Sequence, residues 1–257
     1  MEWYIYPLVV AAGFACGFIN TLAGSGSLIS LPLLIFLGLP ANVANGTNRV
    51  AILLQTMVSV NTFRREGKLK ISNGLWLAVP AIIGAVVGAQ IAVNLDEQMM
   101  RNVIGGLMVV MLIVILIKPK RWLVGRVDLM DQKPGIKQLV TFFGIGIYGG
   151  FIQAGVGIFL LAGLVLAAGY ELVRANAVKN LIILLFTAFA LIIFIYNGQV
   201  RFEMGLILAV GNMLGAWVAT KMAVQRGAEF VRYILIAVVI VSSLVLLGVF
   251  DALKQLV

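Results

Sequence analysis

An apolar run from Ile5 to Leu37 is interrupted near its middle by the stretch Asn20-Thr21-Leu22-Ala23-Gly24-Ser25-Gly26-Ser27. The run is longer than the roughly 20 residues that one membrane crossing needs. Backbone at membrane depth has no water to bond with, so a non-helical break is tolerated only inside protein or beside a watery cavity. We therefore predict two half-helices that meet at a polar break, with the second starting near Ser25. Its free N–H groups and positive dipole end would form an anion site.

The composition is that of a membrane protein. Of 257 residues, 62% are hydrophobic and 11% are charged, and the mean hydropathy is +1.08. The apolar runs are long and do not alternate every second residue, which predicts an all-α polytopic membrane protein embedded in a lipid bilayer. The net charge is +9. Because the basic residues cluster in short loops, we interpret them as determinants of orientation and expect no nucleic-acid partner.

The sequence excludes several chemistries. It has no histidine and a single cysteine, Cys16, so it has no intrachain disulfide, no Cys-rich metal site and no histidine-based catalysis or proton relay. All ten acidic residues fall in predicted loops or at segment ends. Paired carboxylates at membrane depth are therefore not expected. We predict no enzyme activity, no metal and no cofactor.

The chain repeats itself. Gly38 and Gly169 lie 131 positions apart, and the same offset relates Gly24 to Gly155 and Gly26 to Gly157. An internal duplication of this length is stronger evidence about the architecture than any single motif. We predict a first repeat over 5–118, a basic cytoplasmic linker over 119–137 and a second repeat over 138–251. The predicted crossings are Val43–Phe63, Gly74–Asn94, Met99–Ile117, Val173–Tyr196, Phe202–Ala223 and Phe230–Phe250.

The positive-inside rule favours inverted repeats. The loop at 64–70 and the linker are strongly basic, so both are predicted to be cytoplasmic. If each broken segment enters and leaves on one side, the basic region at 221–232 also lies inside and the near-neutral loop at 198–203 lies outside. Each repeat is then a re-entrant broken hairpin plus three crossings, giving about eight membrane segments with both termini outside. Discontinuous helices in inverted repeats are a common transporter plan.

Two cations lie inside predicted crossings. Arg49 and Lys179 each sit about two turns from a helix start, where charge is costly and usually functional. A small oxyanion offers several acceptor oxygens, and Arg can bind two of them while Lys acts as a point charge. Snorkelling of these cations and simple packing of the glycines are the alternatives. The predicted substrate site comprises Asn20, Thr21, Gly24, Ser25, Gly26, Ser27, Asn45, Thr47, Asn48, Arg49, Gln153, Gly155, Gly157, Asn176, Lys179 and Asn180.

Three groups of residues resemble a known family. Gly17-Phe18-Ile19, then Gly24-Ser25-Gly26-Ser27 and Leu31-Pro32-Leu33-Leu34, are similar to the N-terminal signature of the TauE/SafE family, the sulfite-exporter-like membrane permeases. Ala44-Asn45-Gly46-Thr47-Asn48 resembles the motif that opens the next helix, and the second glycine break fits as well. The resemblance implies a prokaryotic inner-membrane transporter. Its implied substrates are small sulfur-containing anions such as sulfite, sulfoacetate and other organosulfonates.

These observations predict potential-assisted export of such an anion by alternating access at a midplane site between the repeats. A negative-inside potential drives each negative charge outward by about 2.3 kcal/mol per 100 mV, so no coupling ion is required. An anion channel of the same architecture and a non-transporting subunit of a membrane complex remain alternatives. Self-association into a homo-oligomer is left open.

Overall fold

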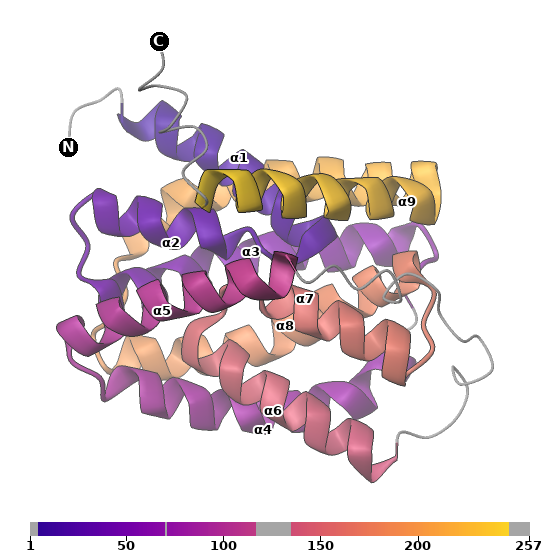
Figure 1. The fold of residues 1–257 in the computed structure, drawn as a ribbon, viewed down its shortest axis with the longest axis horizontal. Coiled ribbons are helices and arrows are strands. Elements are labelled where there is room, and N and C mark those ends of the chain that lie inside the picture. The colour runs from indigo at the N-terminus through magenta and orange to yellow at the C-terminus, as the bar shows by residue number, and fades with distance from the viewer. Residues whose placement is uncertain (1–4, 70, 117–134, 247–257) are drawn as a thin grey trace.

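The computed structural model describes residues 5–69, 71–116 and 135–246 of the chain. Every regular element in these ranges is helical, as the long apolar runs predict. The elements are α1 (Ile5–Ala23), α2 (Ser27–Phe36), α3 (Ala41–Arg65), α4 (Ile71–Val93), α5 (Glu97–Leu116), α6 (Ile136–Ile152), α7 (Val156–Ala162), the π-helical turn η3 (Gly163–Ala167), α8 (Leu172–Tyr196) and α9 (Phe202–Leu246) (Figure 1).

The helix bounds agree with the predicted crossings to within a few residues, with one difference in the last segment. The two helices predicted there are present within α9, but no loop joins them: the chain is helical on both sides of Gly227, whose non-helical φ of +72° separates the two helices. Glycine adopts this left-handed conformation without the steric cost that a Cβ would impose. Most of the predicted linker, both chain termini and Lys70 lie outside the described residues.

The 131-residue offset recurs in the backbone. Both ends of α3 and α8 are separated by 131 positions, and so are the starts of α4 and α9. Three pairs of left-handed glycines obey the same offset: Gly24 and Gly155 (φ +77° and +72°), Gly38 and Gly169 (+91° and +73°), and Gly67 and Gly198 (both +68°). The halves therefore share the length of the helix after each break, the start of the next helix and the positions at which the chain breaks and turns.

Each broken segment returns to the end of the molecule where it starts. Near the start of α1, Val9 packs with Leu34 near the end of α2. In the second half, Gln138 at the start of α6 donates to the Ala167 carbonyl at the end of η3, at 2.5 Å. Figure 1 shows the two broken segments starting from opposite ends of the bundle. The first segment differs from the predicted half-crossing in one respect, because α1 has 19 residues and is about long enough to cross alone.

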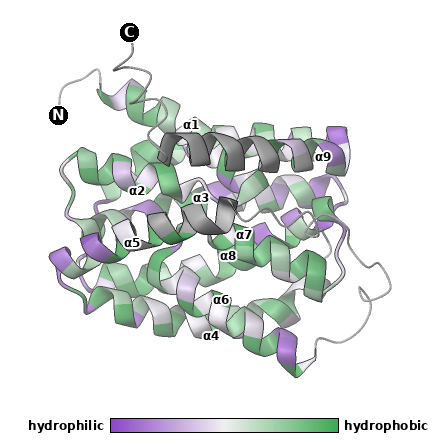
Figure 2. Ribbon diagram, viewed as in Figure 1, coloured by the Kyte–Doolittle hydropathy of each residue, from purple (hydrophilic) through white to green (hydrophobic). Residues whose placement is uncertain are grey.

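The two ends of the bundle differ in charge. We call the end with loops 37–40, 94–96 and 197–201 the neutral end, and the opposite end, with loops 66–69 and 168–171 and the kink at Gly227, the basic end. Described residues at the basic end include the cations Arg64, Arg65, Lys68, Lys137, Arg174, Lys221 and Arg226, and the acids Glu66, Glu171 and Glu229. The neutral end has Asp96, Glu97 and Glu203 against Arg101 and Arg201. Figure 2 shows hydrophilic residues concentrated toward these ends.

Helices are exchanged between the halves. α1 packs along α9, and α6 packs along α4. The backbones approach so closely that a Cβ on Gly17 would overlap the Asn212 backbone, and one on Gly146 would overlap that of Ala81. The second contact repeats the first, since Asn212 and Ala81 are 131 positions apart. Small residues permit such close crossings where lipid provides no hydrophobic drive for helices to associate.

By length and composition, the described part of the chain has four helices suited to crossing a membrane. They are Ile5–Ala23, Gly74–Val93, Leu172–Tyr196 and Phe202–Val231. Large apolar side chains such as Trp76, Ile83, Ile192 and Leu214 point outward along these helices. Such a surface suits contact with lipid tails, so the chain is a membrane-embedded protein.

Candidate functional site

The first break joins α1 to α2 inside the bundle. α1 ends at Ala23, Gly24 takes a left-handed φ of +77°, and α2 begins at Ser27. A Cβ on Gly24 would overlap the backbone of Gly157. This position therefore requires glycine for two reasons, its left-handed φ and the closeness of the Gly157 backbone. The predicted break near Ser25 is confirmed.

The N-terminus of α2 has unused donors. The backbone N–H groups of Ser25, Gly26 and Ser27 have no hydrogen-bond partner among the described residues. The Ser25 hydroxyl is also without a partner, and the residue is only 2% exposed. A helix start leaves its first N–H groups unsatisfied unless a cap, water or ligand supplies acceptors. Here no cap does so, which leaves a cluster of donors at the positive end of a helix dipole.

Amide and hydroxyl side chains line the C-terminal end of α1. Asn20 donates through Nδ2 to Gln55 Oε1 at 3.1 Å, and Asn212 Nδ2 of α9 approaches the same oxygen at 3.4 Å. The Thr21 hydroxyl lies 3.2 Å from that of Ser59 and accepts from Gln55 Nε2 at 3.4 Å. Three helices thus contribute one buried polar network beside the break. Such networks are expensive in an apolar surrounding unless they are satisfied.

A second set of polar contacts fixes α2. Asn48 of α3 donates through Nδ2 to Ser27 Oγ at 3.2 Å, and its Oδ1 accepts from Ser30 Oγ at 2.7 Å. Asn48 therefore holds the first turn of α2 against α3. The Ser27 backbone N–H remains available to a ligand, and its hydroxyl accepts from Asn48 while its own hydrogen stays free to donate.

Lys179 of α8 caps the end of α1. Its Nζ donates to the carbonyls of Asn20 at 3.0 Å and Thr21 at 2.7 Å. Asn176, one turn earlier on α8, donates to the Leu22 carbonyl at 3.1 Å, and Asn180 donates to Asn176 and more distantly to Thr21. A cation at a helix C-terminus stabilises the negative dipole end and satisfies carbonyls that the helix cannot. Lys179 is fully buried, so it does not snorkel to a surface.

Arg49 of α3 performs the equivalent role for α6. Its guanidinium donates to the carbonyls of Gly149 at 3.1 Å and Gly150 at 2.6 Å, and it stacks 4.5 Å from the Phe194 ring centre. Asn45, one turn earlier on α3, donates to the Phe151 carbonyl at 2.8 Å. Arg49 is also fully buried. Each half of the chain thus holds the broken helix of the other half by one cation and by amide side chains, Asn45 in the first half and Asn176 and Asn180 in the second.

The second break is closed by protein contacts. Gly155 is left-handed, with φ +72°, and α7 begins at Val156. The Gly157 N–H donates to the Gly24 carbonyl at 3.2 Å, so the two breaks touch directly. Gln153 donates to Thr187 Oγ1 at 2.5 Å, which leaves its amide oxygen unpaired. The donors of the second helix start are therefore more fully used than those of the first.

The sixteen predicted site residues are all buried, and they gather at the two breaks and at the starts of α3 and α8. Thr47 differs from the rest, because its hydroxyl accepts the backbone N–H of Arg201 at 2.9 Å. The amide oxygens of Asn45, Asn176 and Asn180 lack partners and can accept a bond from a ligand hydroxyl or water. No group of three or more metal-ligating side chains occurs in the ranges that the structure describes.

The predicted substrate site leaves out three members of the first network. Gln55, Ser59 and Asn212 are each 0–1% exposed and lie within hydrogen-bond reach of the break residues or their partners. The signal was available, since polar side chains in the middle of apolar helices rarely face lipid. The spacing of Gln55 and Ser59, one turn apart on α3, also places both on one face.

Comparisons with known proteins agree with this architecture. The family model described as sulfite exporter TauE/SafE matches residues 9–246. Probable membrane transporter protein ORF9 of Sinorhizobium sp is 27% identical over 249 residues, covering 96% of this chain and 94% of the relative. Probable membrane transporter protein YfcA of Escherichia coli K12 is 26% identical over 249 residues, covering 95% and 91%. No solved structure matches the chain.

Proposed function

The chain belongs to the sulfite exporter TauE/SafE family and is a membrane transporter, and we propose that it exports a small sulfur-containing anion. Sulfite, sulfoacetate and other organosulfonates form the proposed substrate class. The observation that carries the proposal is the first break, where three backbone N–H groups and the Ser25 hydroxyl lack acceptors in a buried setting. An oxyanion supplies several acceptor oxygens at once, and helix N-termini bind such groups well.

The balance of charge around the breaks also favours an anion. Arg49 and Lys179 place two basic side chains against the C-termini of α6 and α1. Each helix end offers roughly half a negative charge in return. No acidic side chain in the described part of the chain forms an ion pair with either cation. The basic groups around the breaks therefore face helix ends and no carboxylate, which favours an anion over a cation at this site.

We further propose that the halves are inverted repeats, over 5–118 and 138–251, each with a re-entrant hairpin. The supporting observations are the shared 131-residue offset and the start of the two broken segments from opposite ends. The reciprocal clamps at Lys179 and Arg49 add further support. The greater number of basic residues at the basic end favours a cytoplasmic position for that end in a prokaryotic inner membrane. The linker at 119–137 would then be cytoplasmic and both termini would lie outside.

The packing suggests which parts move in alternating access. α1 packs along α9 and α6 along α4, while Lys179 and Arg49 connect the broken helices to α8 and α3. The moving units would therefore be helix pairs exchanged between repeats, not the repeats as they occur along the chain. Burial of all sixteen predicted site residues is the feature of an occluded carrier and favours a carrier over an open channel.

Flux measurements in proteoliposomes test the proposal. We expect the purified chain to move sulfite or sulfoacetate faster than sulfate or acetate, with a rate that follows the membrane potential and needs no sodium or proton gradient. Failure to move any sulfur anion would refute the function. A requirement for sodium or protons would refute only the uncoupled mechanism.

Variants of the first break test the site. Ser25→Ala removes a hydroxyl that has no protein partner, so the fold should be unaffected. Loss of a hydrogen bond to a charged ligand should raise the half-saturating concentration about tenfold. Lys179→Gln and Arg49→Gln should each lower flux by about tenfold or more because they unclamp a broken helix, while the exposed Arg64→Gln serves as control. Unchanged flux in both clamp variants would remove them from the site, and unchanged affinity in Ser25→Ala would remove Ser25.

A further inference from the structure

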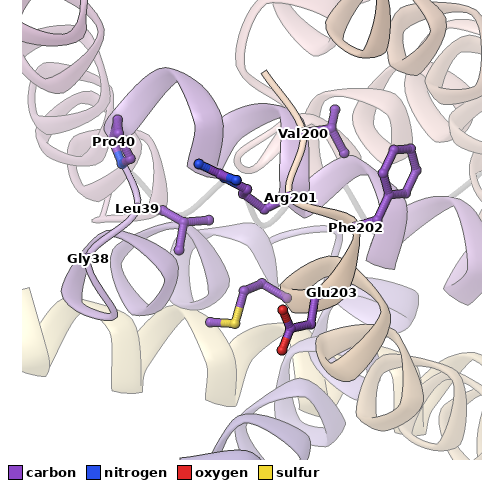
Figure 3. Close-up of a pocket in the computed structure, with 8 residues that line it drawn as sticks. Gly38, Leu39, Pro40, Val200, Arg201, Phe202 and Glu203 are labelled. Atoms are coloured by element: carbon purple, nitrogen blue, oxygen red, sulfur yellow. The ribbon is translucent and has the colours of Figure 1, made fainter. Parts of the chain in front are cut away.

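A surface pocket lies at the neutral end, apart from the two breaks. Its volume is about 460 Å³, and it is lined by the turn Gly38–Pro40 between α2 and α3 and by residues 200–204 at the start of α9. Figure 3 shows these two segments facing each other, with Arg201 and Glu203 on the α9 side. The pocket is large enough for a small oxyanion and its water.

Arg201 is an unpaired cation in this pocket. Its side chain is exposed and makes no hydrogen bond or ion pair with another described residue. The other arginine in the described part of the neutral end, Arg101, is bonded to Glu97 at 3.1 Å. In Figure 3 the Arg201 guanidinium extends across the pocket toward the Leu39 and Pro40 turn. Its planar fork of donors is free to bind the oxygens of a sulfonate or sulfite.

The pocket is joined to the first break through α3. The Arg201 backbone N–H donates to Thr47 Oγ1, and Thr47 is fully buried. The next residue, Asn48, bonds the Ser27 and Ser30 hydroxyls of α2. The segment that carries Arg201 is therefore attached one residue away from the side chain that holds the start of α2.

We propose that this pocket is a second anion station, in which Arg201 binds the transported anion on the outer side of the first break. Glu203 lies in the same pocket and opposes an anion there, which keeps the affinity low and suits release to the outside. The identity of the anion and the outward position of the pocket rest on the proposed function. The presence of a weak anion site at Arg201 does not.

A labelling experiment tests the station without requiring transport. Leu39→Cys places a thiol in the pocket, and the native Cys16 is buried and should not react. The probes are two methanethiosulfonates, one ending in a sulfonate and one in a trimethylammonium group. With Arg201 present, the sulfonate reagent should be favoured, and Arg201→Gln should lower the ratio of the two rates about fivefold. Isethionate should slow labelling only when Arg201 is present.

Controls decide between outcomes. Glu203→Gln should shift the rate ratio in the opposite direction, and Arg101→Gln, at the same end but already ion-paired, should leave it unchanged. Val200→Cys provides a second thiol position in the pocket if Leu39→Cys does not fold. An equal ratio with and without Arg201, or equal effects of Arg201→Gln and Arg101→Gln, would overturn the station. A positive labelling result combined with no sulfur-anion flux would overturn the proposed function and leave the anion site in place.

Discussion

The two breaks have the same backbone but different surroundings. Both have a left-handed glycine, and in both the preceding helix is clamped by a cation from the other half. Beside the first break stand Gln55, Ser59 and Asn212, whereas the positions 131 residues away hold Phe186, Ala190 and Ala81. The shared clamp is therefore a requirement of the fold. The network of Gln55, Ser59 and Asn212 has no counterpart at the second break, where Gln153 and Thr187 form a smaller polar pair, and this difference makes the first break our candidate for ligand contact.

The largest expected effect comes from Gly24→Ala, which would break the contact between the two breaks. A Cβ there meets the Gly157 backbone and also has to adopt φ +77°. Because neither backbone can yield, we expect loss of folded, transporting protein, measured by detergent size-exclusion chromatography and by flux.

Gly38→Ala is the matched control. Gly38 has φ +91° but nothing within 4 Å of its Cβ position, so only the conformational cost of about 1–2 kcal/mol applies. If Gly24→Ala gave as much folded, transporting protein as Gly38→Ala, the direct contact between the two breaks would not be required for folding.

A smaller effect is expected from substitutions that compare the side chains beside the two breaks. Gln55→Leu removes the acceptor shared by Asn20 and Asn212 and leaves buried amides unpaired, so the half-saturating concentration of the anion should rise about tenfold. Phe186→Leu, at the equivalent position, should lower the free energy of unfolding by about 1 kcal/mol. It should leave the half-saturating concentration of the anion unaltered. Similar kinetic effects of both changes would mean that the two breaks contribute equally to binding.

The smallest effects are expected where the halves are equivalent. Gly67 and Gly198 both have φ +68° and both have open space at their Cβ positions. Gly67→Ala and Gly198→Ala should each cost about 1–2 kcal/mol of stability, by the same strain, without altering transport. Thermal unfolding in detergent measures this, and a large difference between the two variants would show that the halves differ beyond the breaks.

The sequence was sufficient to predict the helices and the breaks. Long apolar runs mark helices in a membrane protein, and the glycines at the first break and its repeat mark places where a helix cannot continue. The kink at Gly227 was less predictable. The sequence between Ala223 and Phe230 is polar enough for a loop, yet the structure continues as helix on both sides of one residue.

The partners of the buried cations could not be predicted in the same way. Arg49 and Lys179 were recognised because charge at membrane depth is rare. Their contacts, however, are carbonyls more than 100 residues away, at the ends of helices from the opposite half. A local pattern shows that a residue is unusual but not which distant backbone it meets. Their direct contact with substrate stays a prediction, as do the roles of the other break residues.

The exchange of α1 and α6 between the halves has a consequence for assembly. The glycine face of α1 is covered by α9, and that of α6 by α4, so each half leaves a close-packed helix surface that only the other half can fill. If the chain is divided into two polypeptides within 117–134, neither half should fold in the bilayer when it is expressed alone. The two halves should recover the folded structure when they are co-expressed. An ancestor of half this length would have had to fold as a pair of chains that traded their first hairpins.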